Sequence, residues 1–291
     1  MGNRILTILA IILCLSASLP ATAVERNVEK SIDVKRGGTL YLNSDLGGVE
    51  ISSHAQNTVQ VKVRMVAHTS SDSRAEDIFN NFTLDFNKND KDVTISGSLP
   101  KRWFWNNYHL SVYFNVTVPE QYNLDVRTGG GRIIVGDIKG QVTVKTSGGG
   151  IKLGNIKGEV NARTSGGGID VKDVTGNASV KTSGGGIRIG SVKGNLEART
   201  SGGPIIAELT RQVDGPVELR TSGGGIRLTI PADFKANLDA STSGGRVYSD
   251  IPITVHGKIS NTTINGKING GGPELRLRSS GGGIRIEQST H

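Results

Sequence analysis

Six basic residues recur at nearly regular intervals in the second half of the chain. Each directly precedes a threonine of a glycine-rich motif: Arg127, Lys145, Arg163, Lys181, Arg199 and Arg220. Guanidinium and ammonium groups hold carboxylates and phosphates through charge-assisted hydrogen bonds. If the repeat stacks these side chains in one row, they form a basic column suited to lipopolysaccharide or another acidic polysaccharide. The alternative is a solvated face that serves solubility. Nucleic acid is disfavoured, because no aromatic residues interleave for base stacking.

A pair of aspartates is the best candidate for catalysis. Glycosidases need two carboxylates about 5 to 10 Å apart, and Asp137 and Asp173 occupy the same turn position two repeats apart. The equivalent positions in the intervening and following repeats are Asn155 and Ser191. Turn aspartates usually accept hydrogen bonds from their own backbone. We therefore predict a turn role and no catalytic residue, and keep a lyase or glycosidase as the alternative function.

Other catalytic and metal-binding chemistry is not indicated. The histidines show neither the spacing of a zinc site nor a nucleophile motif; they are His54, His68, His109, His256 and His291. The single cysteine, Cys14, lies in the N-terminal apolar run. The sequence predicts no cofactor and no metal.

The loop around Trp103 and Trp105 is the one aromatic cluster. Packing of these rings in the core or at the end of the fold is the favoured interpretation. A contact patch for sugar or lipid is the alternative.

A repeat must position all of these residues. The motif Thr-Ser-Gly-Gly-Gly-Ile, or a close variant, begins at Thr128, Thr146, Thr164, Thr182, Thr200, Thr221, Thr242 and Ser279. The first four intervals are 18 residues, the next two are 21, and the last is 37. Apolar residues alternate with polar ones in short bursts between the glycines, as in strands with one buried face. One burst pattern per repeat predicts one coil of a β-solenoid, stacked at about 4.8 Å.

Three further expectations follow from this stacking. Isoleucine should lie on isoleucine through the core, and the motif threonines should point inward and form a hydrogen-bonded ladder. The glycines should occupy corners with positive φ, where residues with a Cβ are disfavoured.

Composition divides the chain into parts. Eleven of the 13 aromatic residues lie between Tyr41 and Tyr122, whereas 35 of the 41 glycines follow Arg127. We expect a strand-rich N-terminal part or cap over residues 24–126 and the glycine-rich solenoid over 127–291. A short helix over 71–81 should cover one end of the stack.

The N-terminus has the order of a secretory signal. A basic start at Arg4 precedes the apolar run Ile5 to Leu19, and Ala21-Thr22-Ala23 follows Pro20 as a cleavage site. We expect residues 1–23 to be removed on export, leaving no transmembrane segment.

The chained glycine motifs, the Val118-Pro119 step and the stretch Leu228-Thr229-Ile230-Pro231 leading to Ala240-Ser241-Thr242-Ser243-Gly244-Gly245 resemble a bacterial family. It is the putative-adhesin β-strand-repeat family, catalogued largely as a domain of unknown function. The resemblance covers most of residues 38–287 and implies a secreted β-solenoid without catalytic residues. The prediction is an all-β, exported, non-enzymatic module of the cell envelope that binds, adheres or serves as a scaffold, in the periplasm or at the surface.

Overall fold

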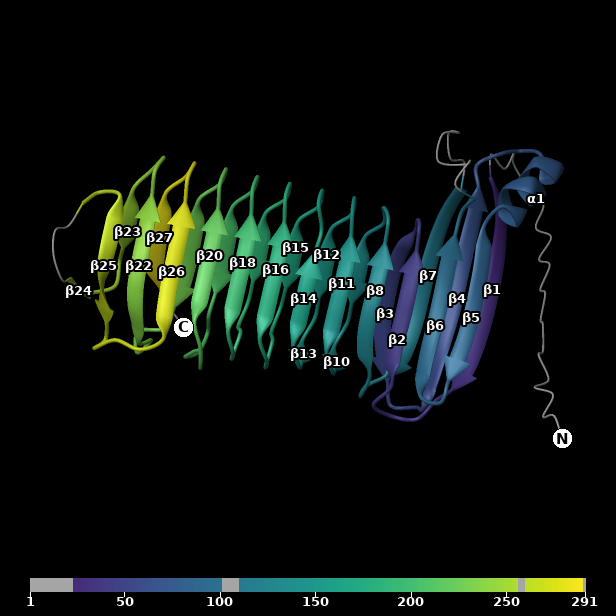
Figure 1. Ribbon diagram of the computed structural model, residues 1–291, viewed down its shortest axis with the longest axis horizontal. Helices are drawn as coiled ribbons and strands as arrows, with labels where there is room; N and C mark the ends of the chain where they lie inside the picture. The colour runs from purple at the N-terminus through teal and green to yellow at the C-terminus, as the bar shows by residue number, and fades with distance from the viewer. Residues whose placement is uncertain (1–22, 101–109, 256–259, 290–291) are drawn as a thin grey trace.

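The computed structural model describes residues 23–100, 110–255 and 260–289. In this part of the chain the protein is a flattened β-solenoid, in which two long sheets enclose one narrow core (Figure 1). The all-β solenoid predicted from the repeat is confirmed.

Sheet A has 12 strands. In spatial order they are β1 (Val24–Asp33), β4 (Thr58–Ala67), β7 (Leu110–Pro119), β3 (Gly48–His54), β9 (Ile133–Val135), β12 (Ile151–Leu153), β15 (Ile169–Val171), β17 (Ile187–Ile189), β19 (Ile205–Glu208), β21 (Ile226–Ile230), β27 (Ile284–Gln288) and β23 (Val247–Ser249).

Sheet B has 13 strands. In spatial order they are β24 (Ile253–Val255), β25 (Thr263–Ile268), β22 (Ala236–Thr242), β26 (Glu274–Ser279), β20 (Val217–Thr221), β18 (Leu196–Thr200), β16 (Ala178–Thr182), β14 (Val160–Arg163), β11 (Val142–Thr146), β8 (Asn123–Thr128), β2 (Thr39–Ser44), β6 (Asp92–Ser98) and β5 (Thr83–Asn89). A third, two-stranded sheet pairs β10 (Ile138–Lys139) with β13 (Ile156–Lys157).

Neighbouring coils in the middle of the stack pair in parallel, so that equivalent residues of successive repeats lie opposite each other. Ile151 lies opposite Ile169, and Ile169 opposite Ile187, in sheet A. Val142 lies opposite Val160 in sheet B. These side chains are all buried, so the predicted stacking of like residues is confirmed.

The coils at the two ends are not stacked in chain order. The coil of β2 and β3 lies between that of β6 and β7 and that of β8 and β9. At the other end, the C-terminal coil of β26 and β27 lies between β20–β21 and β22–β23. The 37-residue interval before Ser279 therefore contains more than one coil. After β23 the chain forms the antiparallel strands β24 and β25 and then enters the stack again as β26.

Antiparallel strands cover both sheets at the N-terminal end and sheet B at the C-terminal end, where parallel coils would expose unpaired edges. At the N-terminal end, β1 and β4 extend sheet A and β5 extends sheet B. Helix α1 (Asp72–Asn80) packs there through Ala75, Ile78 and Phe79, and begins at Ser71, whose hydroxyl accepts a hydrogen bond from the backbone N–H of Arg74. The short helix predicted over 71–81 is confirmed. At the C-terminal end, β25 pairs with β22 and β24.

The expected reason for the repeated glycines is wrong. Among the described glycines, positive φ occurs at Gly37, Gly47, Gly270 and Gly271 and at none in the 18-residue repeats. Close stacking explains them instead: a Cβ on Gly167 would lie 2.4 Å from the carbonyl oxygen of Gly149 in the adjacent coil.

The motif threonines point inward, and their hydroxyls join adjacent coils. Thr146 donates a hydrogen bond to the carbonyl oxygen of Gly131 at 2.8 Å, and Thr182 to that of Gly167 at 2.7 Å. The ladder continues through the inserted C-terminal coil, where Ser279 donates to Gly224 and Thr242 donates to Gly282. The predicted internal ladder is confirmed.

Candidate functional site

The six basic residues singled out from the sequence lie in one row on the outer face of sheet B. Strand register sets Arg127 opposite Lys145, and successive coils add Arg163, Lys181, Arg199 and Arg220. Their neighbours along each strand, such as Val144 and Ala162, are buried, so the basic side chains point outward. We call this row the basic column.

A seventh member of the basic column was missed. Arg278 lies opposite Arg220 and precedes Ser279. The signal was present in the sequence, because Ser279 begins the last copy of the motif and the residue before it is again basic. The serine in place of threonine and the longer interval concealed it.

Carboxylates neutralise four members of the column. Arg127 forms an ion pair with Asp125 at 3.0 Å, and Arg278 forms one with Asp239. Lys181 contacts Glu197 at 2.8 Å. Arg199 contacts both Glu197, at 2.9 Å, and Glu218, at 3.1 Å.

The other three members carry free charge. Within the described residues, Lys145, Arg163 and Arg220 take part in no ion pair and no side-chain hydrogen bond, and all three are exposed. Lys145 and Arg163 lie on adjacent coils, whereas Arg220 lies three coils farther along. The column is therefore a positive patch at β11 and β14, followed by a neutralised stretch and a third free cation.

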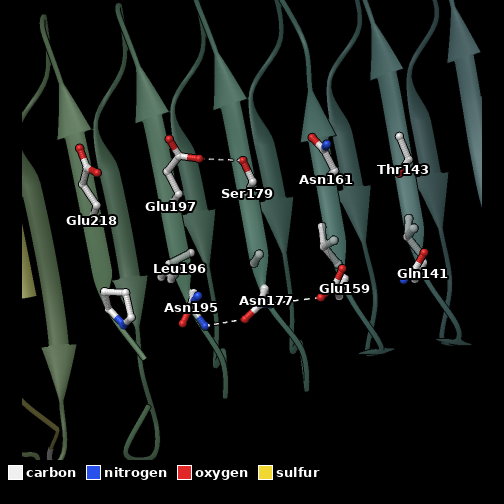
Figure 2. A pocket seen from close by; sticks show the side chains of 14 residues that line it. Gln141, Thr143, Glu159, Asn161, Asn177, Ser179, Asn195, Leu196, Glu197 and Glu218 are labelled. Carbon is white, nitrogen blue, oxygen red and sulfur yellow. Dashed lines mark hydrogen bonds between the residues drawn. The ribbon is translucent and has the colours of Figure 1, made fainter. Parts of the chain in front are cut away.

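A shallow groove of about 520 Å³ runs along sheet B beside the column (Figure 2). Two outward-facing rows line it. The first row comprises Gln141, Glu159, Asn177, Asn195 and Pro216, and the second comprises Thr143, Asn161, Ser179, Glu197 and Glu218. The column forms the next outward row, since Lys145 follows Thr143 by two residues on β11. The groove thus offers amides, hydroxyls and carboxylates, with cations along one rim.

Several polar groups of the groove already bond one another. Asn177 donates a side-chain hydrogen bond to Glu159 at 3.1 Å and accepts one from the backbone N–H of Asn195 at 3.0 Å. Ser179 donates to Glu197 at 3.0 Å. Figure 2 shows these contacts running from coil to coil.

Glu197 is ionised in this setting. Partial burial raises the pKa of its carboxyl, but hydrogen bonds from Lys181 and Ser179, with the charges of Lys181 and Arg199, lower that pKa overall. At neutral pH the Glu197 carboxylate is therefore charged and, with Glu218, balances the charges of Lys181 and Arg199.

The aspartates considered for catalysis hold adjacent coils together. Asp137 accepts hydrogen bonds from the backbone N–H of Asn155 at 2.8 Å and from its side-chain amide at 2.9 Å. Asp173 accepts one from the backbone N–H of Ser191 at 3.1 Å. The expectation that they bond their own backbone was wrong, because their partners belong to the next coil.

Asp137 does not have the properties of a general acid. The backbone hydrogen bond from Asn155, with that from its side chain, lowers the pKa of Asp137. A glycosidase acid needs a pKa raised towards neutrality.

Trp103 and Trp105 lie outside the described residues. Among the described residues, the exposed aromatic rings are those of Tyr41, Tyr113 and Tyr248. The guanidinium of Arg64 lies over Tyr113, and that of Arg285 lies over Tyr248.

No group of three His, Cys, Asp or Glu residues in the described ranges could hold a metal ion. No helix in the same ranges has the length and hydropathy needed to cross a bilayer.

The fold and the register define the class: a capped, two-sheet β-solenoid with a charged outer face. The sequence profile of the Toastrack DUF4097 family matches residues 38–287. The chain belongs to this family, in agreement with the resemblance noted from the motifs.

Solved structures that align with most of the chain are distant from it in sequence. A putative lipid binding protein from Parabacteroides distasonis is 17% identical, with 93% of this chain and 98% of that chain covered and a TM-score of 0.42. A putative cell adhesion protein from Clostridium sporogenes is 14% identical, with 91% and 100% covered and a TM-score of 0.31. A putative adhesin from Bacteroides fragilis is 10% identical, with 91% and 97% covered and a TM-score of 0.37. No curated protein matches the chain.

Proposed function

We propose that the protein is an exported, non-enzymatic module of the cell envelope that binds acidic glycans through the outer face of sheet B. Adhesion to, or scaffolding of, envelope polysaccharide is the role that such binding would serve. The observation that carries the proposal is the basic column with free charge at Lys145 and Arg163, lying beside a groove of amide and hydroxyl groups.

The chemistry of this face suits a sugar polymer. Polysaccharides present hydroxyls that exchange hydrogen bonds with amides and carboxylates, and acidic ones add carboxylates or phosphates for which lysine and arginine are the natural partners. The solenoid repeats its groups at about 4.8 Å along its axis. A linear ligand lying along that axis would meet the same kinds of group on successive coils.

Export is the second component of the proposal. It rests on the N-terminal order of Arg4, the apolar run Ile5 to Leu19 and the Ala21-Thr22-Ala23 site. In the exported protein, residues 24–126 would form the N-terminal part and residues 127–291 the solenoid that binds the ligand.

Glycan and lipid arrays probed with the mature protein at two salt concentrations test the function. We expect binding to acidic glycans at 0.1 M salt and its loss at 1 M, because the Debye length falls from about 10 Å to about 3 Å. Replacing Lys145, Arg163, Lys181 and Arg199 together by glutamine should abolish it. Absence of any acidic glycan among the ligands, or undiminished binding by the quadruple variant, would refute the proposal.

A further inference from the structure

Five neighbouring side chains on two coils have no partner of their own. They are Gln141, Thr143, Lys145, Asn161 and Arg163, from β11, from β14 and from the residue before β11. None of them forms a side-chain hydrogen bond or an ion pair with any described residue. Two amides, a hydroxyl and two cations thus face solvent together, over one end of the groove.

The next coils differ in this respect. Asn177 and Ser179 bond to Glu159 and Glu197, and Lys181 and Arg199 bond to glutamates. Their polar groups are satisfied within the protein. A ligand would have to break these contacts to use them, whereas the cluster at β11 and β14 is available without that cost.

The coils beyond this cluster offer an anionic ligand little positive charge. Glu197 and Glu218 neutralise Lys181 and Arg199 there, and Glu159, which forms no ion pair with any described residue, lies beside Gln141 in the first row. Like charges brought together at an interface oppose binding. A polymer with an anion on every unit would place some of its charges on the neutralised coils and others against Glu159.

On the basis of the proposed function, we infer that Gln141, Thr143, Lys145, Asn161 and Arg163 form a subsite for one anionic sugar of a glycan whose charges are separated by neutral sugars. The anionic group contacts Lys145 and Arg163. The ring hydroxyls contact Gln141, Thr143 and Asn161, and the neutral sugar that follows lies against the satisfied, carboxylate-bearing coils.

Strand geometry is consistent with this placement. Alternate residues of a strand are about 7 Å apart, so Thr143 lies one such step from Lys145 and Gln141 lies two steps from it. A sugar ring across the groove can present its acid group to the rim and its hydroxyls to the inner rows.

Two probes of equal length separate sparse from dense charge. Hyaluronan oligosaccharides carry a carboxylate on alternate sugars, and oligogalacturonides carry one on every sugar. We expect the wild-type protein to bind hyaluronan oligosaccharides about tenfold more tightly by calorimetry, because the denser chain meets neutralised coils and the unpaired carboxylate of Glu159.

Three double variants assign the effect. Lys145→Gln with Arg163→Gln should weaken binding of hyaluronan oligosaccharides by about tenfold or more. Glu197→Gln with Glu218→Gln should tighten oligogalacturonide binding by about fivefold or more, since it frees Lys181 and Arg199 to contact the chain. Lys152→Gln with Arg188→Gln, an equal charge change on the outer face of sheet A, should alter neither. Melting curves verify folding.

The failures can be told apart. If the wild type binds oligogalacturonides more tightly and Glu197→Gln with Glu218→Gln changes nothing, the subsite is wrong while glycan binding stands. If acidic glycans bind neither in the calorimetry experiments nor on the arrays, both the subsite and the proposed function are wrong.

Discussion

The hydroxyl of Thr164 donates a hydrogen bond of 2.7 Å to the carbonyl oxygen of Gly149, 15 residues earlier and one coil away. Thr164 is buried, so water is poorly placed to replace this hydrogen bond if it is lost. The same contact recurs from coil to coil and joins the turn of each coil to the next strand of sheet B. The hydroxyl therefore links each strand of sheet B to the turn of the preceding coil.

Thr164→Val keeps the shape of the side chain and removes the donor. We expect the free energy of unfolding in urea to fall by about 1–2 kcal/mol, since the Gly149 carbonyl loses a buried partner. Thr175→Val, at an exposed hydroxyl without a side-chain hydrogen bond, is the control and should change it by less than about 0.5 kcal/mol. Equal effects of the two substitutions would show that the ladder contributes nothing.

Gly167 and Gly130 test why glycine recurs. A Cβ at Gly167 would lie 2.4 Å from the Gly149 carbonyl oxygen, whereas one at Gly130 would meet nothing within 4 Å. Gly167→Ala should lower the free energy of unfolding by about 1–3 kcal/mol through overpacking. Gly130→Ala should leave it unchanged or raise it by up to about 1 kcal/mol. A destabilised Gly130→Ala would point to backbone conformation instead.

The 18-residue period predicted the strand pairing in most of the repeat region, because residues one period apart lie on adjacent coils. A residue 18 positions on from Ile151 must be its neighbour in sheet A, and Ile169 is. The outward direction of Lys145 followed from its buried neighbour Val144 by the same rule. Inward threonines followed too, because Thr146 continues the phase of Val144.

Features that depend on contacts between distant segments could not be predicted in this way. The motif at Ser279 identifies a coil, but nothing local states that it pairs with both β20 and β22. Which cations each glutamate pairs with, as Glu197 does with Lys181 and Arg199, depends on side-chain positions across coils. The role of the glycines was misassigned, since close stacking and a positive φ demand the same residue.

The inserted C-terminal coil should hold the end of the solenoid in place. Leu277 is fully buried in β26 and lies opposite Leu219 on one side and Ala240 on the other. Leu277→Asp buries a charge without a partner, which is strongly unfavourable. Because each coil contacts only its neighbours, we expect β22–β25 to lose protection from hydrogen exchange while β14 and β16 keep it.

Glu274→Gln, an exposed change on the same strand, is the control for this measurement. It removes a surface ion pair with Arg276, which is worth about 0–1 kcal/mol. Uniform loss of protection along the whole stack in Leu277→Asp would contradict the local role of the coil.

Asp137 should stabilise the fold in a pH-dependent way. Hydrogen bonds from Asn155 lower its pKa in the folded protein, so its contribution is present above the unfolded pKa, about 3.9, and is lost as pH falls through the folded value. Asp137→Asn should lower the melting temperature at pH 7 and do so less as the pH is reduced below 4. A constant difference at all pH values would exclude this linkage.

The same substitution tests the enzymatic alternative. If Asp137 and Asp173 only join coils, any cleavage of acidic polysaccharides in a preparation should be unchanged in the double variant Asp137→Asn with Asp173→Asn. Activity in the wild type that disappears in the folded double variant would make the protein a carbohydrate-active enzyme.

The basic column should divide into two parts in stability as well as in binding. Lys181 and Arg199 hold the carboxylate of Glu197, and removing both leaves it half-buried and unpaired. We expect Lys181→Gln with Arg199→Gln to lower the free energy of unfolding by about 1 kcal/mol. Lys145→Gln with Arg163→Gln should leave it unchanged or raise it slightly, because two stacked, unpaired cations repel each other.

Melting temperatures measured as a function of pH test this division into paired and free cations. The folded pKa of Glu197 is lowered by its partners despite burial, so its stabilising effect exists at neutral pH and disappears as pH falls through that pKa. The difference in melting temperature between the wild type and Lys181→Gln with Arg199→Gln should therefore close in acid. The Lys145→Gln with Arg163→Gln variant has no such carboxylate contact and should follow the wild type at every pH. If both variants melted alike at pH 7, the division of the column into paired and free cations would be wrong, and the subsite at β11 and β14 would lose its electrostatic basis.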